Sequence, residues 1–320
     1  MDTSEKIQQL RAVINKELKP LIDGDYVYLD LPYHNNIGDT LIWQGTLSFL
    51  KSIPYKCLYS TSYDNYNDSK VDNSSIILFQ GGGNFGDLYM VLNDFRKNVI
   101  RQHPHQTVII LPQTVTYQNK DNLLKDAEFY ANYPNVTICA RDKVSYNILK
   151  EHFTNNKILL LPDMAFFIDV DKRLYKKFIP GKTLYLKRTD KEMEDVYGDV
   201  VPFNAEVHDW PTYEKIHKVQ LYIYRLINIF KRVDNLIHTS FASNVNDFMW
   251  KNILRTYNVQ LGCNFLAPYE FIYTTRLHVM ILSILLHKHH ISILDNKYGK
   301  LSSFYESWLS DLSTVKYIKK

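Results

Sequence analysis

Short apolar runs recur along the first half of the chain, and stretches with helical spacing of apolar residues separate most of them. Strands that alternate with helices are joined by right-handed crossovers, and such crossovers build a parallel sheet. We therefore predict an α/β fold with buried strands and with helices on both faces of the sheet. The predicted strands of this half are 26–31, 57–59, 76–79, 108–111, 136–139 and 158–160, and its predicted helices are 4–18, 38–49, 88–101, 122–130 and 143–151.

A second series of strands and helices follows a polar, Lys-rich segment at residues 169–182. That segment has no apolar periodicity, which is typical of a linker between domains. We predict two Rossmann-like domains, residues 1–175 and 176–320, that face a central cleft. The predicted strands of the second half are 183–186, 235–238, 271–273 and 291–294, and its predicted helices are 212–231, 244–257 and 276–287.

The charges of the chain argue against a nucleic-acid partner. The net charge is only +4, and Lys and Arg are interspersed with Asp and Glu, so no basic stripe could neutralise a phosphate backbone. The basic tail at residues 315–320 could contact an anionic membrane surface and make the protein a peripheral membrane protein. A solvated, fraying chain end is the favoured explanation of this tail.

The cysteines and the apolar segments point to the cytoplasm. Cys57, Cys139 and Cys263 lie far apart without C-x-x-C spacing, so neither a disulfide framework nor a zinc site is expected. Residues 1–11 are polar where a secretory signal would be apolar, and the most apolar stretch, 279–286, is too short to span a bilayer. We predict a cytoplasmic protein with reduced thiols.

Two segments of the first half follow predicted strands, where open α/β sheets bind their ligands. In the first, Asn36 and Gly38 suit a tight turn and Asp39 a helix cap, but a carboxylate at that place can also orient or deprotonate a hydroxyl. The second has three consecutive glycines, whose entropic cost on folding favours a ligand-facing loop over a simple turn. The candidate residues of this loop are Gly82, Gly83, Asn84 and Asp87.

Four side chains that are cationic or can become so follow other predicted strands and form a candidate anion site. Arg141 offers a planar fork for a carboxylate or phosphate, although a surface ion pair would also explain it. Arg276 and His278 lie where a helix begins, and helix N-termini attract anions. Lys300 follows the next strand at the same end of the sheet.

The local sequence allows more than one role for some residues of this candidate anion site. Thr274 or Thr275 can cap the helix, so that its first turn carries Arg276 and His278. A buried histidine with a purely structural role is the alternative for His278.

The motifs, in their order along the chain, resemble those of the polysaccharide pyruvyl transferase family. The resemblance implies a glycosyltransferase-B-like fold of two domains. It also implies transfer of the enolpyruvyl unit of phosphoenolpyruvate to a sugar, usually as a pyruvate ketal with release of phosphate. The motifs are N-x-G-D at 36–39, F-Q-G-G-G-N-F-G-D at 79–87, A-R-D at 140–142, L-P-D at 161–163, T-R-L-H at 275–278 and D-N-x-Y-G-K at 295–300.

The resemblance also implies roles for individual residues. Arg141, Arg276 and Lys300, with Thr275, would bind the carboxylate and phosphate of the donor, and His278 would be the general acid. The acceptor would lie on the N-terminal domain, with Asp39 as a candidate base. The residues implied to face it are Asn36, Asp39, Gly82, Gly83, Asn84 and Asp87.

The implied reaction needs phosphoenolpyruvate as co-substrate and neither a cofactor nor a metal ion. Its acceptor would be a sugar of a surface polysaccharide or of a lipid-linked precursor, in the latter case at the inner face of the membrane. The turn at residues 287–290 departs from the small apolar turn of the family, and a metal site there stays open beside a solvated turn. A glycosyltransferase with a nucleotide-sugar donor and a non-catalytic carbohydrate-binding protein are the alternative functions. The acceptor sugar and the oligomeric state stay open.

Overall fold

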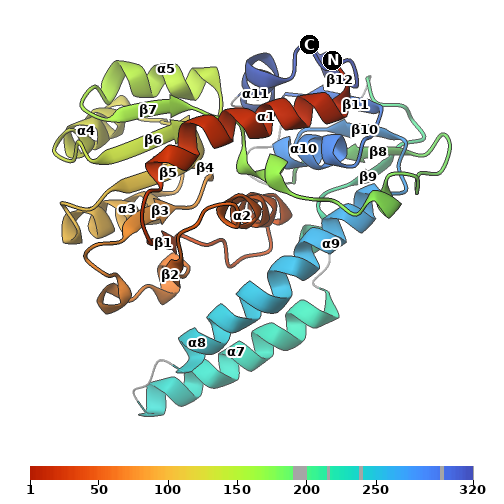
Figure 1. Cartoon of the computed structure of the whole chain (residues 1–320). Coiled ribbons are helices and arrows are strands. Elements are labelled where there is room, and N and C mark those ends of the chain that lie inside the picture. The colour runs from red at the N-terminus through yellow and green to blue at the C-terminus, as the bar shows by residue number, and fades with distance from the viewer. Residues whose placement is uncertain (190–199, 215–216, 238–240, 296–298, 320) are drawn as a thin grey trace.

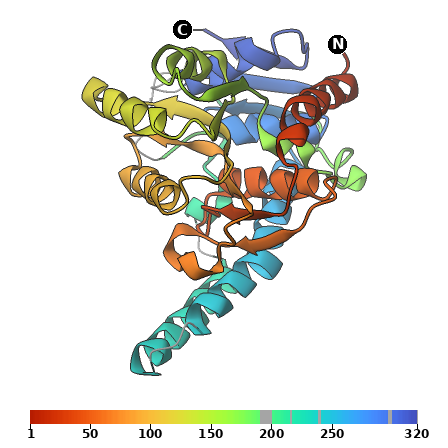
Figure 2. The same ribbon diagram turned by 60° about the vertical axis from the view of Figure 1, so that its left-hand side comes forward.

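A computed structural model describes residues 1–189, 200–214, 217–237, 241–295 and 299–319. They form two parallel β-sheets flanked by helices, which confirms the predicted α/β class (Figures 1 and 2). The strands of the first sheet are β1 (Tyr26–Leu29), β2 (Cys57–Ser60), β3 (Ile76–Phe79), β4 (Gly82–Gly86), β5 (Val108–Thr116), β6 (Val136–Ala140) and β7 (Lys157–Leu160). The helices of this half are α1 (Thr3–Leu18), α2 (Ile37–Leu50), α3 (Met90–Gln102), α4 (Lys120–Ala131) and α5 (Lys143–His152).

The second sheet is built from the C-terminal half of the chain. Its strands are β8 (Thr183–Leu186), β9 (Glu206–His208), β10 (Phe271–Thr274), β11 (His290–Leu294) and β12 (Val315–Ile318). The helices of this half are α6 (Pro211–Glu214), α7 (Lys218–Ile237), α8 (Phe241–Met249), α9 (Arg255–Leu266), α10 (Leu277–Leu285) and α11 (Lys300–Trp308).

The two sheets repeat one strand order. The first is ordered β2-β1-β3-β5-β6-β7, with β4 paired to β5, and the second is ordered β12-β11-β10-β8-β9. In each sheet the first strand along the chain lies between the second and the third, and the order reverses there. Ligands of open α/β sheets bind at such a reversal, outside the carboxyl ends of the strands. The topology therefore marks the loops after β1 and β3 and those after β8 and β10.

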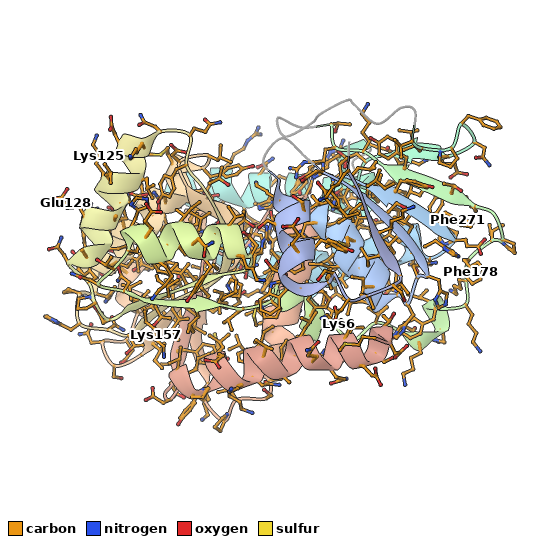
Figure 3. All side chains as sticks on the ribbon, turned by 90° about the horizontal axis from the view of Figure 1, so that it is seen from above. Lys6, Lys125, Glu128, Lys157, Phe178 and Phe271 are labelled. Atoms are coloured by element: carbon orange, nitrogen blue, oxygen red, sulfur yellow. The ribbon has the colours of Figure 1, made fainter. Side chains whose placement is uncertain are left out.

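Helix α1 packs against the cores of both sheets. A capping box at Asp2 starts the helix. Ile7 and Leu10 then contribute to the core around the second sheet, whereas Ile14 and Leu18 contribute to the core under the first. Figure 3 shows α1, which carries the labelled Lys6, lying across both halves of the molecule. The first helix thus holds the two sheets together.

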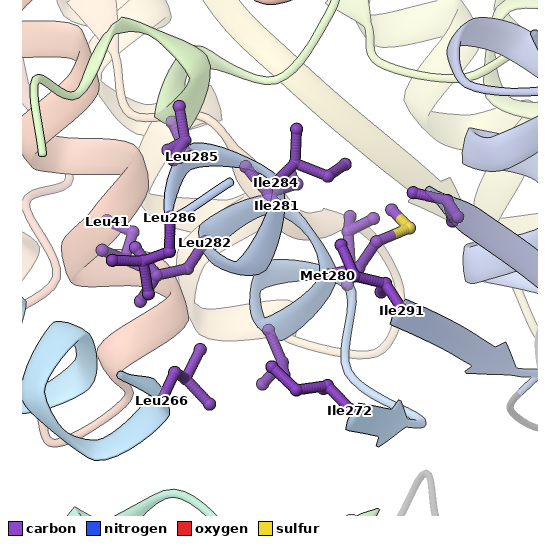
Figure 4. Close-up of a cluster of buried hydrophobic side chains, with 14 of the residues drawn as sticks. Leu41, Leu266, Ile272, Met280, Ile281, Leu282, Ile284, Leu285, Leu286 and Ile291 are labelled. Carbon is purple, nitrogen blue, oxygen red and sulfur yellow. The ribbon is translucent and has the colours of Figure 1, made fainter. Parts of the chain in front are cut away.

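Helix α10 is buried on every side, and all of its residues except His278 and Ser283 are apolar. All of its residues, Leu277–Leu285, are buried. In Figure 4 Met280, Ile281 and Leu282 lie on this helix, with Leu41 of α2 and Ile272 of β10 in the same cluster. Such burial stabilises by about 1.5–3 kcal/mol per large apolar side chain. His278, in the first turn, is therefore carried by a rigid element.

Helices α7 and α8 form a hairpin that projects from the body of the molecule (Figure 1). Helix α8 continues through a π-helical turn, Trp250–Leu254, into α9. Trp250 and Leu254 pack with Ile223 and Ile227 of α7 against the core under the first sheet. Among the described helices, none combines the length and the apolarity needed to cross a membrane.

Several predictions for the second half need correction. The strand predicted at 235–238 is wrong, because the apolar spacing of α7 continues and keeps the chain helical to Ile237; residue 238 lies outside the described residues. The helix predicted at 244–257 is one part of a helical segment that runs from Phe241 to Leu266. Strand β9, with an exposed charged residue, and helix α11 were not predicted.

The C-terminal tail is also different from its prediction. Residues Val315–Ile318 are not a fraying end but the edge strand β12, which pairs with β11 in parallel register. Val315 is buried, Lys316 is exposed, and Tyr317 and Ile318 are half-buried, as expected of a strand at the edge of a sheet.

Two predictions for the first half also changed. Strand β2 is an exposed edge strand rather than a buried one, and Leu58 is 49% exposed. The glycine segment is not entirely a loop, because Gly82–Gly86 pairs in parallel with β5 as strand β4. For β2, the short apolar run thus predicted a strand correctly but did not predict that the strand would be exposed.

The turn at residues 287–290 is only partly solvated. His289 and His290 are exposed, whereas Lys288 is 3% exposed and its Nζ donates to the carbonyls of Ala267 and Tyr269 at 2.6 and 2.7 Å. Within the described part of the chain, no three His, Cys, Asp or Glu side chains gather at a metal-binding distance.

Burial lowers the pKa of Lys288 from 10.5 to about 8. The unfolded chain therefore binds more protons than the folded one between pH 8 and 10.5, and stability rises with pH across this window. Relative to Lys288→Met, the wild-type protein should gain on the order of 3 kcal/mol of unfolding free energy from pH 8 to pH 10.5. Urea unfolding of both proteins at each pH measures the difference in unfolding free energy. A difference that does not change with pH would show that the amine of Lys288 stays charged in the folded protein.

Candidate active site

A cavity of about 830 Å³ opens at the carboxyl ends of strands from both sheets. Its walls include loops after β1, β3 and β6 of the first sheet and after β8, β10 and β11 of the second, and segments after β2, β4 and β9 complete them. The strand orders mark four of these six loops as ligand sites. The predicted residues that line it are Asn36, Asp39, Gly83, Asn84, Arg141, Arg276, His278 and Lys300.

Asp163 joins two of the cationic groups. Its Oδ2 accepts a hydrogen bond from Nη1 of Arg141 at 2.8 Å and lies 3.3 Å from Nε2 of His278. The carboxylate is fully buried, and its Oδ1 accepts from the backbone N–H of Ala165. Burial alone would raise the pKa of Asp163, but His278 and Arg141 hold it well below its usual range. An ionised Asp163 therefore fixes the orientation of both the guanidinium and the imidazole.

Asp209, which follows β9, holds Arg276 in a bidentate ion pair. Nε and Nη2 of Arg276 donate to the two carboxylate oxygens at 2.5 and 2.7 Å. Both side chains are at least 95% buried, and the guanidinium lies over the ring of Tyr213, with 5.1 Å from Cζ to the ring centroid. A buried pair of this geometry fixes the guanidinium in one plane. Arg276 is thus presented to the cavity in a single orientation.

The helix cap predicted for α10 is wrong in detail. Arg276 itself is the N-cap residue, and no side chain caps the helix. The hydroxyl of Thr274 accepts from the N–H of Arg276, which precedes the helix, and the hydroxyl of Thr275 accepts from the N–H of Arg188 at 3.0 Å. The threonines therefore fix the loops after β10 and β8, and the N–H groups of the first turn have no side-chain cap.

The glycine segment lies against the cationic groups. A Cβ on Gly83 would come within 3.3 Å of Nη2 of Arg141 and 3.8 Å of Nζ of Lys300. Lys300 is 6% exposed at the start of α11, where Gly299 takes a left-handed conformation with φ of 62°. Arg188, after β8, also lines the cavity. Positive side chains from both halves of the chain thus surround one part of the cavity.

Gly38 gives His278 its space. A Cβ at residue 38 would lie 2.7 Å from Nδ1 of His278, closer than real side chains approach. Helix α2 packs against this imidazole only because residue 38 has no side chain. Gly38→Ala should therefore displace His278 and lower kcat about 100-fold, the cost expected of a misplacement of about 1 Å. The matched control is Gly24→Ala, whose Cβ would meet only a methyl group of Ile76 at 3.9 Å; equal activities of the two variants would contradict this close contact.

The other part of the cavity holds a carboxylate and amides. Asn36 caps α2, since its Oδ1 accepts from the N–H of Gly38, and its Nδ2 donates to Asp39 at 2.7 Å. Asn36 rather than Asp39 is therefore the cap. Nε2 of His34 lies 3.6 Å from the same Oδ2 of Asp39. Asp39 is held by two neighbours while it lines the cavity.

A buried ion pair supports Asn84 from behind. Nη2 of Arg96, which is fully buried, donates to Oδ1 of Asn84 and to Oδ2 of Asp30, both at 2.5 Å. Burial raises the pKa of Asp30, which lies directly after β1 with a left-handed φ of 66°. Such a conformation is uncommon outside glycine and concentrates at functional sites. The loops after β1 and β3 are thus tied together where they line the cavity.

A known protein family matches the part of the chain that forms most of this cavity. The sequence profile of the polysaccharide pyruvyl transferase family matches residues 36–298, which are most of the chain and include most of the cavity wall, although Lys300 and the residues before Asn36 lie outside the match.

The chain belongs to this family.

Two relatives are similar to this transferase over most of its length. EpsO of Bacillus subtilis, which carries the name of a pyruvyl transferase, is 32% identical over 98% of this chain and 93% of its own. Pyruvyl transferase 1 of Schizosaccharomyces pombe is 29% identical over 88% of this chain and 69% of its own. A crystal structure of an uncharacterised protein of Klebsiella pneumoniae has the same fold, with a TM-score of 0.60, 21% identity and coverage of 97% of this chain and 99% of that one.

Three of the predicted site residues are not on the wall of the transferase cavity. Asp87 accepts hydrogen bonds from the N–H groups of Gln118 and Asn119 and so fixes the turn before α4. Thr275 bonds to the backbone of Arg188. Gly82 lies behind the wall, where its left-handed φ of 146° places an added Cβ 3.8 Å from Asp39.

The sequence analysis missed other residues of the transferase cavity. Arg188 and His34 line it, and Asp163 and Asp209 position its cationic groups. Asp163 stands in the L-P-D motif, which was noted without a role. The others follow β1, β8 and β9, where the topology places ligands. Inspection of every strand end for charged residues would have found them.

Proposed function

We propose that this transferase moves the pyruvyl group of phosphoenolpyruvate to two hydroxyls of a sugar, forming a pyruvate ketal and releasing phosphate. The observation that carries the proposal is the convergence of Arg141, Arg276 and Lys300 on one cavity that also holds His278. Phosphoenolpyruvate has two anionic groups, a carboxylate and a phosphate, on three carbon atoms. Arginine forks held by buried carboxylates suit both groups.

His278 would supply the first proton. Its Nε2 lies 3.3 Å from the ionised Asp163, which holds the imidazole in a fixed orientation where His278 lines the cavity. That proton goes to the methylene carbon of phosphoenolpyruvate and leaves an oxocarbenium-like centre at the neighbouring carbon. The cationic side chains keep the phosphate in place during this step, so no metal ion is needed.

The acceptor would complete the ketal in two steps. One sugar hydroxyl forms a C–O bond to the oxocarbenium-like carbon and gives its proton to a base, for which Asp39 is the candidate. A second hydroxyl of the same sugar then forms another C–O bond, the bond from carbon to the phosphate oxygen breaks, and the proton of this hydroxyl leaves with the inorganic phosphate. The proton taken up by the base from the first hydroxyl returns through solvent to His278, which restores the enzyme. Asn36 and Asn84 line the same side of the cavity and suit the remaining hydroxyls.

The proposal assigns the two halves of the chain different substrates. Residues 1–175 would form an acceptor domain and residues 176–320 a donor domain, with the cavity as the cleft between them. Arg141 would reach the donor from the acceptor side. The acceptor would be a sugar of a surface polysaccharide or of its lipid-linked precursor, and the reaction would take place in the cytoplasm.

Ligand-dependent melting tests the donor. Phosphoenolpyruvate at about 100 times its Kd should stabilise the folded state by about 2.7 kcal/mol and raise the Tm, whereas UDP and GDP sugars should leave the Tm unchanged. Arg276→Ala should abolish the rise. A rise with a nucleotide sugar alone would instead support a glycosyltransferase.

A further inference from the structure

Helix α7 carries an exposed apolar stripe besides its buried one. The buried stripe includes Gln220, Ile223 and Ile227, which face the rest of the molecule. The exposed stripe repeats at intervals of three and four residues and therefore lies on one face of the helix. Tyr222 is 66% exposed and Ile229 is 56% exposed. The exposed stripe consists of Val219, Tyr222, Ile229 and Val233, with the half-buried Leu226 in the same row.

A basic row borders this stripe on the side away from the body. Lys218, Arg225 and Arg232 recur every seventh residue, so they form a line along the helix, and all three are exposed. No Asp or Glu occurs between residues 218 and 233. Among the described residues, none of the three basic side chains has a recorded ion pair with a carboxylate. An apolar stripe beside an unbroken basic row is typical of helices that lie in the interface of an anionic bilayer.

The hairpin of α7 and α8 is placed next to the cavity. Ser62, Tyr63 and Asp64 line the cavity, and the following residue, Asn65, donates through Nδ2 to the carbonyl of Ser243 and to Asp247 on α8, at 3.1 and 3.0 Å. The hairpin also projects from the body, so its outer face can meet a flat surface (Figure 1).

We propose that the exposed stripe of α7 and its basic row dock the protein on an anionic lipid surface. The stripe from residue 219 to 233 is about 21 Å long, at 1.5 Å per residue. The apolar side chains enter the headgroup region while the basic row meets lipid phosphates. Docking would hold the cavity close to a lipid-linked acceptor. The surface itself does not depend on the donor proposed above.

A second copy of the chain fits this stripe less well. In a two-fold antiparallel pair of α7 helices, the row of Lys218, Arg225 and Arg232 would face the same row of the other copy. Three cations opposite three cations repel one another, and the segment has no carboxylate to separate them. The charges therefore favour an anionic surface over a dimer.

Vesicle flotation of the full-length protein tests the proposal. The vesicles contain equal parts of phosphatidylglycerol and phosphatidylcholine, or phosphatidylcholine alone. The wild-type protein should float with the anionic vesicles, weakly with the neutral ones, and less in high salt. Arg225→Glu/Arg232→Glu and, separately, Tyr222→Ser/Ile229→Ser should each lower the partition coefficient at least about tenfold.

Matched variants use residues that are equally exposed on other helices. Lys125→Glu/Lys150→Glu changes the same charge on α4 and α5, and Leu124→Ser/Val144→Ser removes apolar groups from those helices. These variants should float like the wild-type protein, and all four should retain phosphate release with a soluble acceptor, which separates docking from catalysis. The proposal is overturned if the wild-type protein does not float, if it floats equally with neutral vesicles, or if the α7 variants only convert a dimer to a monomer.

Discussion

His278→Gln is expected to release phosphate from phosphoenolpyruvate about 10²- to 10⁴-fold more slowly than the wild-type protein, the loss typical of a missing general acid. Glutamine keeps a polar side chain of similar size beside Asp163 but has no proton to give at neutral pH. The Tm should fall only slightly, and phosphoenolpyruvate should still raise it, because Arg141 and Arg276 remain. Phosphate release in the presence of acceptor measures the rate.

The control for this variant is His152→Gln, which changes a half-buried histidine on α5 that does not line the cavity. Its rate of phosphate release should equal that of the wild-type protein. Retention of more than about a tenth of the activity in His278→Gln would mean that His278 is a structural histidine, since a general acid contributes more than that.

Asp163→Asn is expected to weaken both the fold and the reaction. The substitution leaves the buried Arg141 and His278 without their common anion, and removal of one partner from a buried pair costs roughly 3 kcal/mol of unfolding free energy. Because the folded-state pKa of Asp163 is depressed, this contribution is complete above the ordinary carboxyl pKa and is lost as the pH falls through the folded-state value. The difference between the two proteins should therefore be constant from pH 8 to about pH 5 and narrow below about pH 4.

The same variant should lower kcat about 100-fold, because the imidazole and the guanidinium lose their fixed orientation. Asp311→Asn is the matched control: Asp311 pairs with Lys6 at 2.7 Å but is half exposed, and a surface pair contributes 1 kcal/mol or less. Chemical denaturation and phosphate release compare the two variants. Equal losses of unfolding free energy in both variants would contradict the claim that Asp163 stabilises the buried Arg141 and His278.

The strands of the fold could be predicted where both of their faces are buried. Such strands are continuous apolar runs, as in β1 and β3, and parallel sheets covered by helices contain many of them. The edge strands β9 and β12 escaped prediction because they carry polar residues toward solvent. The end of α7 was mistaken for a strand, since a short apolar run does not distinguish the two structures without its neighbours.

The cationic groups of the site could also be predicted, because each follows a strand and local sequence shows strand ends. Their anionic partners could not. Asp209 lies 67 residues from Arg276, and Asp163 lies 115 residues from His278, so only the folded chain brings these pairs together. The role of Gly38 could not be predicted for the same reason, because its lack of a side chain matters only where His278 packs against it in the folded chain. Local sequence thus predicts which charges face the cavity, whereas their orientation is a property of the tertiary structure.

The most direct test of the proposed reaction is the mass of the product. The protein is incubated with phosphoenolpyruvate and an acceptor saccharide with two neighbouring free hydroxyls, and both the saccharide and free phosphate are measured. The account predicts that the saccharide gains the mass of pyruvic acid less one water, with one phosphate released for each saccharide modified and neither product formed by His278→Gln. An unchanged saccharide with phosphoenolpyruvate left intact, together with a gain of a hexose less one water when a nucleotide sugar is supplied instead, would contradict it.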